Sequence, residues 1–172
     1  MNIIIAKPKE EHAEAIADIC STGWKQTVDG KLSEEYQTKN SAFWYNLERV
    51  KNDIKQGSYS YVAIHHAKVI GVIGGDITKP HTGEVFMLYM DENYRYKGVG
   101  RQLLDALTKK QIEEGATEQW VSVQEDNDRG IPFYEARGFI YRKKKITMTE
   151  TGEEQVSFRY VRKVEGGESL WK

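Results

Sequence analysis

The segment from residue 85 to residue 107 constrains the fold most strongly, because its pattern changes from strand to loop to helix within a few residues. Residues 85–90, V-F-M-L-Y-M, form an apolar run that is typical of a buried strand. The loop 95–100 reads R-Y-K-G-V-G and contains two glycines. Apolar side chains then recur at positions 99, 103, 104 and 107, the spacing of one helix face. We therefore expect a core strand that runs through a glycine-bearing loop into a helix.

A loop of this kind is suited to holding phosphate. The first backbone N–H groups of a helix lack intrahelical partners, and the helix dipole places partial positive charge there. Gly98 and Gly100 have no Cβ to keep a ligand from the backbone, and Arg95, Lys97 and Arg101 add positive charge. The pattern predicts an anion site and leaves the phosphate ligand open.

The composition fits one ordinary domain. A chain of 172 residues can bury a real core, and a net charge of −1 gives no sign of a nucleic-acid or membrane partner. Cys20 is the only cysteine, and the four histidines lack the spacing of zinc ligands, so we expect no disulfide and no metal. The first seven residues are too short and lack the basic lead-in of a signal peptide, which favours a cytoplasmic protein.

Hydrophobic periodicity and turn residues predict a series of strands and helices. Strands are expected at residues 2–6, 59–64, 69–77, 84–90, 120–124, 139–149 and 156–163. Helices are expected at residues 10–28, 33–57 (with Ser33 as N-cap), 99–115 and 131–137. Hairpins on both sides of a strand–loop–helix–strand unit imply a mixed sheet with helices on its faces.

Two familiar phosphate loops do not match. A P-loop requires G-x-x-x-x-G-K-[ST], and no such string occurs in the chain. A dinucleotide fingerprint requires G-x-G-x-x-G, but position 103 is leucine and the strand–helix–strand order does not repeat. What remains is the pattern R-x-x-G-x-G at the start of a helix.

With these residues in view, the chain resembles the GNAT superfamily of acyl-CoA-dependent N-acetyltransferases. R-Y-K-G-V-G at 95–100 matches the pyrophosphate motif of that family, although Glu92 stands where proline is frequent. About thirty residues later, N-D-R-G-I-P-F-Y-E-A-R-G-F at 127–139 resembles N-x-x-A-x-x-[FL]-Y-E-x-x-G-F. Gly130 departs from this second pattern, because alanine is usual there. The element order also agrees, so the resemblance covers nearly all of the chain.

The resemblance implies an α/β (α+β) fold. Its expected centre is a mixed, mostly antiparallel sheet of about seven strands, flanked by about four helices. The central strands at 84–90 and 120–124 are expected to splay apart and offer a strand edge to a ligand. We expect a single acetyltransferase domain over residues 1–164 and a C-terminal tail over residues 165–172.

The resemblance also implies acetyl-CoA as co-substrate and no metal. The diphosphate is expected at the loop and helix start, and the pantetheine arm at backbone groups of the central strand. The residues carried over for binding are Leu88, Met90, Arg95, Tyr96, Lys97, Gly98, Val99, Gly100, Arg101, Asn127 and Tyr134. For Arg95, the alternative is a solvated loop charge. Asn127 is expected to contact the arm or to cap the following helix.

Acetyl transfer to an amine benefits from a base and an acid. Glu84, at the start of the central strand, takes the position of the catalytic glutamate of many relatives, and an ordinary solvated strand-end glutamate is the alternative. Tyr134 takes the position of the general acid that protonates the leaving sulfur, and a packing tyrosine is the alternative. Because relatives differ in their base, a water chain in place of Glu84 stays open.

The acceptor is expected to be a small-molecule or peptide amine. In the family the acceptor site lies over the first two helices and the C-terminal hairpin, where Trp24, Tyr36 and Trp44 could contact a cationic amine. These aromatic side chains could equally be core. A homodimer that pairs residues 156–161 is an expectation by analogy alone. Two other functions stay open: a non-catalytic acyl-CoA sensor and an interaction module that uses the sheet edge.

Overall fold

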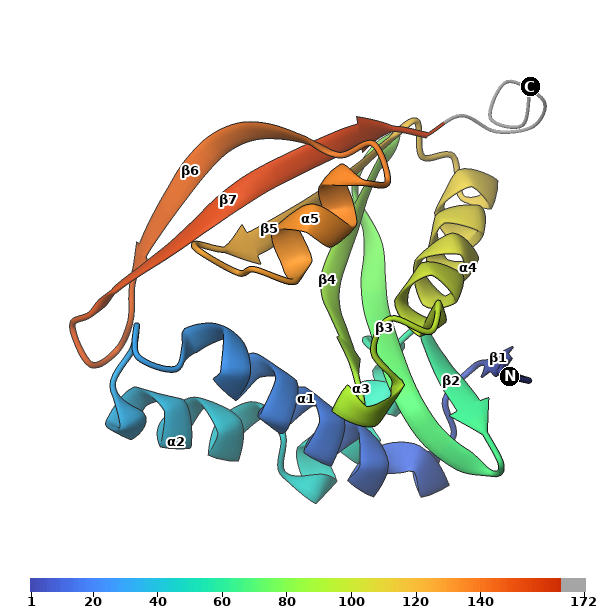
Figure 1. The fold of residues 1–172 in the computed structure, drawn as a ribbon, viewed down its shortest axis with the longest axis horizontal. Helices are drawn as coiled ribbons and strands as arrows, with labels where there is room; N and C mark the ends of the chain where they lie inside the picture. The colour runs from blue at the N-terminus through green and yellow to red at the C-terminus, as the bar shows by residue number, and fades with distance from the viewer. Residues whose placement is uncertain (165–172) are drawn as a thin grey trace.

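The computed structural model describes residues 1–164, which form a single seven-stranded sheet (Figure 1). The strands lie in the order β1-β2-β3-β4-β5-β7-β6, and only the β4–β5 pair is parallel. Their bounds are β1 Ile4–Ala6, β2 Tyr61–His65, β3 Lys68–Lys79, β4 Thr82–Met90, β5 Glu118–Gln124, β6 Ile140–Met148 and β7 Glu154–Lys163. The predicted mostly antiparallel sheet is confirmed, and the predicted tail lies outside the described residues.

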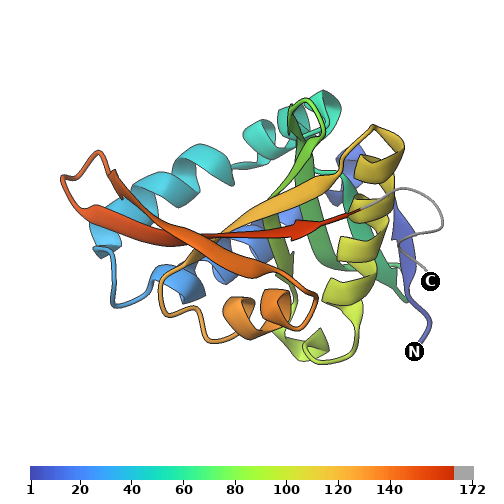
Figure 2. The same ribbon diagram turned by 90° about the horizontal axis from the view of Figure 1, so that it is seen from above.

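Helices cover both faces of this sheet. Their bounds are α1 Ala13–Val28, α2 Glu34–Trp44, α3 Leu47–Gln56, α4 Val99–Glu113 and α5 Gly130–Glu135. One core cluster joins α4 and α5 to the sheet through Leu103, Ile73 and Tyr134, and a second joins α1 and α3 to the other face through Ile16 and Val50. Seen from above, α2 and α5 lie on opposite sides of the β6–β7 hairpin (Figure 2). Within residues 1–164, no helix is both long and apolar enough to cross a bilayer.

The single helix predicted from residue 33 to residue 57 is wrong, because the structure has two helices there. The first helix begins after Ser33, whose side chain accepts a hydrogen bond from the Tyr36 N–H as predicted for an N-cap. The chain then leaves helical geometry at Asn46 (φ −80°, ψ 154°). The Asn46 amide oxygen accepts from the Arg49 N–H at 2.8 Å and starts α3. Asn46 therefore divides the segment with helical apolar spacing into two helices.

Strands β4 and β5 separate, as expected. They pair from Thr82↔Glu118 to Val85↔Val121, and no pairing continues beyond that point. A register shift between β3 and β4 leaves Phe86 without a partner opposite Gly74 and Gly75, which marks a bulge where the strands part. Residues 86–90 and 122–124 therefore present backbone edges to the space between them.

The expected homodimer through residues 156–161 stays a prediction, and the position of these residues in the sheet constrains it. Strand β7 lies between β5 and β6, and both of its edges are hydrogen-bonded to those strands. The edge strand of this half of the sheet is β6. A dimer through the interior strand would require breaking one of the two existing ladders.

Candidate functional site

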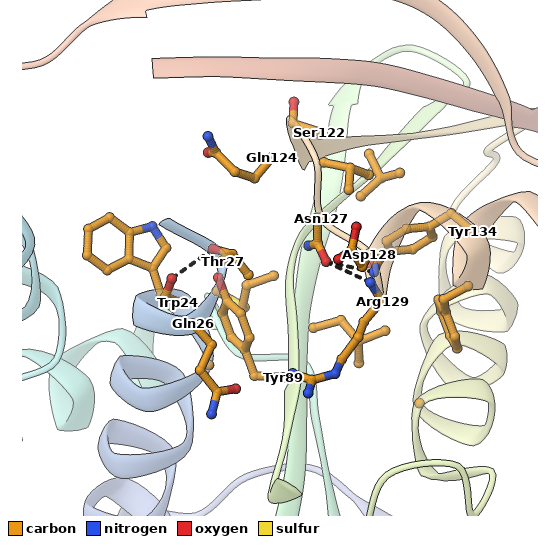
Figure 3. A pocket seen from close by; sticks show the side chains of 18 of the residues that line it. Trp24, Gln26, Thr27, Tyr89, Ser122, Gln124, Asn127, Asp128, Arg129 and Tyr134 are labelled. Atoms are coloured by element: carbon orange, nitrogen blue, oxygen red, sulfur yellow. Dashed lines mark hydrogen bonds between the residues drawn. The ribbon is translucent and has the colours of Figure 1, made fainter. Parts of the chain in front are cut away.

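A cleft of about 980 Å³ occupies the space between β4 and β5. Its walls come from α1, β4, the start of α4, β5, α5 and the β6–β7 hairpin, so it reaches from one face of the sheet to the other. Figure 3 shows Trp24, Gln26 and Thr27 on the α1 wall and Asn127, Arg129 and Tyr134 on the opposite wall. The cleft brings together segments that are more than a hundred residues apart in the chain.

The phosphate loop ends at the rim of this cleft. Gly98 is the N-cap of α4 and has a left-handed backbone (φ +81°), which explains why glycine stands there. Gly100 is closely packed, because a Cβ on it would lie 2.8 Å from Met90 Cε and 3.2 Å from Phe133 Cε1. Residues 98–101 line the cleft, and the first-turn amides of α4 have no intrahelical partners. This is the geometry expected for binding a diphosphate.

Two arginines converge on the same rim. The Arg95 side chain is 18% exposed and donates to the Gln26 amide oxygen on α1. Burial lowers the pKa of Arg95, and the positive charge of Arg129 lowers it further. Both arginines line the cleft, so two like charges lie near each other there. An anion between them would relieve that repulsion.

The other loop residues predicted to bind the ligand have different positions. Tyr96 lines the rim with a left-handed backbone (φ +62°) and is 91% exposed. Arg101 lines the cleft and lies 3.7 Å from the Asp105 carboxylate. Lys97 does not line the cleft, and its ammonium lies 5.9 Å from the Tyr94 ring centre. Leu88, Met90 and Val99 are part of the lining.

Tyr134 lies in the wall of the cleft and is only 7% exposed. Its ring packs edge to face against Phe133 and Phe139, with centroids 5.1 and 5.3 Å away. Burial raises the pKa of Tyr134, and the Arg162 cation offsets this only in part. The phenol therefore keeps its proton at neutral pH, so it is available as a proton donor.

Asn127 lies just before α5. Its amide oxygen accepts from the Gly130 N–H at 2.8 Å and from the Arg129 N–H at 3.2 Å. A Cβ at Gly130 would lie 2.7 Å from Asn127 Nδ2, so glycine lets the asparagine close onto the helix start. Asn127 therefore contacts the helix start without being its N-cap residue, and its side chain also lines the cleft.

Glu84 is not part of the cleft lining. Its two carboxylate oxygens accept from Arg159 at 2.9 and 3.1 Å, and the two side chains are 21% and 16% exposed. Arg159 also donates to the Ser122 hydroxyl at 2.8 Å and lies 5.1 Å from the Trp120 ring centre. The structure therefore joins Glu84 to β7 and leaves no carboxylate oxygen unengaged.

Comparison with known proteins identifies the family. Residues 17–139 match the acetyltransferase (GNAT) family model. The chain belongs to the GNAT family. The match includes both motifs, the phosphate loop at 95–100 and the segment at 127–139, and the predicted family, fold and enzyme class are confirmed.

Individual relatives agree with this assignment. The spermidine N(1)-acetyltransferase of Thermoplasma acidophilum is 29% identical over 144 residues, which cover 81% of this chain and 89% of the relative. The structure of the PaiA N-acetyltransferase of the same organism in complex with coenzyme A has a TM-score of 0.78 at 27% identity, covering 95% of this chain and 100% of that one. A GCN5-related N-acetyltransferase structure from Rhodopseudomonas palustris has a TM-score of 0.77 at 19% identity, covering 95% and 97%, and shows the shared fold alone.

The aromatic residues predicted for the acceptor site of this GNAT protein do not all reach the cleft. Trp24 lines it, and the Trp24 ring packs edge to face against Tyr36, with centroids 6.0 Å apart. Tyr36 therefore supports the lining from behind. Trp44 lies on the surface, 42% exposed, with the Arg49 guanidinium 4.4 Å from its ring centre. The structure does not bring Trp44 to the cleft.

Sequence reasoning missed several residues that line the GNAT cleft. These are Arg129 on the loop before α5 and the polar side chains of Ser122, Gln124, Lys145, Thr147, Gln155 and Ser157. Polar side chains at every second position of β5 and β7 could have indicated one shared polar face, because residues two apart on a strand point to the same side of the sheet. Within residues 1–164, no group of three or more His, Cys, Asp or Glu side chains is placed to hold a metal.

Proposed function

We propose that this chain is a cytoplasmic enzyme that transfers an acetyl group from acetyl-CoA to a primary amine. The observation that carries the proposal is the cleft between the splayed strands, which ends at the uncapped amides of α4 with Arg95 and Arg129 beside them. A relative of the same fold is known in complex with coenzyme A. The residues present fit such a ligand in shape and in charge.

Different residues along the cleft bind different parts of acetyl-CoA. The α4 amides beyond Gly98, together with Arg95 and Arg129, hold the diphosphate. The unpaired edge of β4 near Leu88 and Met90 accepts the peptide-like arm as an added strand. When bound, acetyl-CoA supplies an acetyl group whose bond to sulfur breaks as its bond to the acceptor nitrogen forms, while the nitrogen loses one proton and the sulfur gains one.

Tyr134 is proposed as the residue that gives the sulfur its proton. It lines the cleft, and burial raises its pKa, so the phenol carries a proton whenever the arm is in place. The packing of its ring against Phe133 and Phe139 fixes the direction of the hydroxyl. Packing and acid catalysis are therefore compatible at this position.

Glu84 can act as the base only if it separates from Arg159. Both of its oxygens are engaged by that guanidinium, and it does not line the cleft. The geometry favours proton removal from the amine through water and a positioning role for Glu84. Replacement by glutamine distinguishes the two roles, since a base lost from an intact cleft lowers kcat without changing acetyl-CoA binding.

Binding and turnover together test the proposal. A thermal shift with coenzyme A is expected, because ligand at 100 times its Kd adds about 2.7 kcal/mol to stability. No shift would contradict both the enzyme and the acyl-CoA sensor, and would leave the sheet-edge interaction module. Release of free thiol from acetyl-CoA with a panel of polyamines, amino acids, amino sugars and peptides distinguishes the enzyme from the sensor. Polyamines are included because a relative is a spermidine acetyltransferase.

A further inference from the structure

One face of the C-terminal half of the sheet forms the far end of the cleft from the diphosphate loop. Directly paired residues share a face, and the pairs Gln124↔Ser157 and Ser157↔Lys145 place β5, β7 and β6 side chains in one row. Gln155 and Thr147 form the next pair on the same face. All five side chains line the cleft, and Figure 3 shows Gln124 beneath the hairpin, away from Arg129.

Lys145 is the one residue of this row that carries a charge. Among the ion pairs and hydrogen bonds of residues 1–164, none involves its ammonium group. The other lysine of the cleft, Lys31, is engaged, because its ammonium donates to the carbonyl oxygens of Thr27 and Glu125. Within residues 1–164, Lys145 is therefore the cleft lysine whose ammonium has no protein hydrogen-bond partner, whereas that of Lys31 is held by two carbonyl oxygens.

In the part of the chain that the structure describes, no carboxylate of the cleft forms an ion pair with Lys145. Asp126 and Asp128 line the cleft on either side of Asn127, on the loop that also carries Arg129. Glu84 shares the face of the polar row, but Arg159 takes both of its oxygens. Within residues 1–164, a ligand at the polar row therefore meets an ammonium that no carboxylate pairs with.

An edge strand often carries lysine simply to prevent pairing with other chains. Strand β6 is such an edge, and Arg142, Lys143 and Lys144 serve that purpose. Lys144 pairs with Phe158, on the opposite face from Lys145, and does not line the cleft. Prevention of pairing with other chains explains why β6 carries cations, but it does not explain why Lys145 faces the cleft.

We propose that the acceptor is a primary amine that also carries a carboxylate or a phosphate, and that Lys145 binds this anionic group. The inference rests on the proposed acetyl transfer and names the acceptor class for the same cleft. The hydroxyls and amides of the row complete the site by hydrogen bonding to the anion and to the acceptor's polar atoms. A polycation is disfavoured here, because a second ammonium would lie close to Lys145.

Acceptors matched in length test the inference. The first series is 4-aminobutanoate, 4-aminobutanamide and 1,4-diaminobutane, which end in an anion, a neutral amide and a cation. The second series compares glucosamine with glucosamine 6-phosphate, so that carboxylate and phosphate are tested separately. We expect kcat/KM for the anionic member of at least one series to exceed that of its neutral member by about 5-fold, the scale of an exposed ion pair.

The same two substitutions at Lys145 and at its neighbour Lys144 locate the effect. Lys145→Gln should raise KM for the anionic acceptor by about 5-fold, with kcat and the neutral acceptor's KM unchanged. Lys145→Glu should reverse the preference toward the diamine. Lys144→Gln and Lys144→Glu are the controls, since this neighbour faces away from the cleft, and they should leave the preference as in the wild type.

The inference is overturned if no anionic acceptor is preferred over its neutral partner, or if the Lys145 and Lys144 variants change the preference equally. Failure to acetylate either anionic acceptor also overturns it. A thermal shift with coenzyme A, measured in the same samples, separates failure of the proposed function from failure of the acceptor class. A retained shift with any acetylated amine means that the proposed function stands and that only the acceptor class is wrong.

Discussion

Replacing Arg129 with alanine should weaken coenzyme A binding without lowering the stability of the free protein. Arg129 lines the cleft, and its charge lowers the pKa of Arg95. In the free protein the two guanidinium groups repel each other, so removal of one is neutral or slightly stabilising. With a diphosphate bound, removal of Arg129 becomes unfavourable, because each cation then faces a negative charge.

The size of the effect follows from the exposure of Arg129. A hydrogen bond to a charged group contributes about 1.5–3 kcal/mol, and the exposed position of Arg129 favours the lower end. A loss of about 1.4 kcal/mol corresponds to a Kd about ten-fold higher. With ligand at 100 times the wild-type Kd, stabilisation then falls from about 2.7 to about 1.4 kcal/mol. For a chain of this length the thermal shift should fall from about 5–10 °C to about 3–6 °C.

Calorimetric titration gives Kd directly, and thermal unfolding with and without ligand gives the stability of both states. S-acetylpantetheine, which lacks the diphosphate, should bind the variant and the wild type equally. Lys55→Ala serves as the control of equal charge, since this residue lies in the last turn of α3, on the other side of the sheet. Its coenzyme A affinity should equal that of the wild type.

Three results would refute the reasoning. An unchanged Kd for coenzyme A would remove Arg129 from the diphosphate site. Equal weakening of S-acetylpantetheine would mean that the substitution disturbs the cleft as a whole. A free protein that melts several degrees lower would indicate a structural role for the guanidinium.

Three further substitutions test other parts of the cleft. Tyr134→Phe should lower kcat about 10²-fold with acetyl-CoA affinity unchanged, and unaltered turnover would leave Tyr134 as packing alone. Because burial raises the pKa of Tyr134, the phenol should stay protonated, and the wild-type kcat should show no alkaline loss from this group below about pH 10. Glu84→Gln should lower the free energy of unfolding by about 1–2 kcal/mol, since Arg159 loses its charged partner while both side chains are only partly exposed; unchanged stability with a collapsed kcat would instead identify a base. Gly130→Ala should lower stability by about 0.5–1 kcal/mol, measured by urea unfolding, because the new Cβ displaces Asn127; a gain in stability would contradict the close contact.

The phosphate loop was predictable because every signal for it is local. The apolar strand, the two glycines and the helical period stand within about 25 residues and need no knowledge of the rest of the fold. The structure agrees down to the left-handed Gly98 at the N-cap of α4. The splay of β4 from β5 came from the family resemblance instead, since no local pattern states where two paired strands separate.

Residues whose role depends on distant partners could not be placed from the sequence. Glu84 was expected as a base from its position on the central strand, but its environment is set by Arg159, 75 residues later. Arg129 stands inside the second motif, yet its approach to Arg95 depends on how two loops meet at the rim. The break at Asn46 differs from these cases, because a capping residue in the middle of the apolar pattern was a local signal.

The ion pair between Glu84 and Arg159 lies where β4 and β5 begin to separate. Glu84 pairs with Trp120, one position before β4 and β5 make their last contact at Val85 and Val121. The pair therefore connects β4 to β7 across β5, at the point from which the strands diverge. Only four residue pairs join β4 to β5, so a cross-link at this position resists further opening of the ladder. We therefore propose that Glu84 helps to fix the separation of β4 and β5 at the narrow end of the cleft, a role that requires a carboxylate there and no proton transfer.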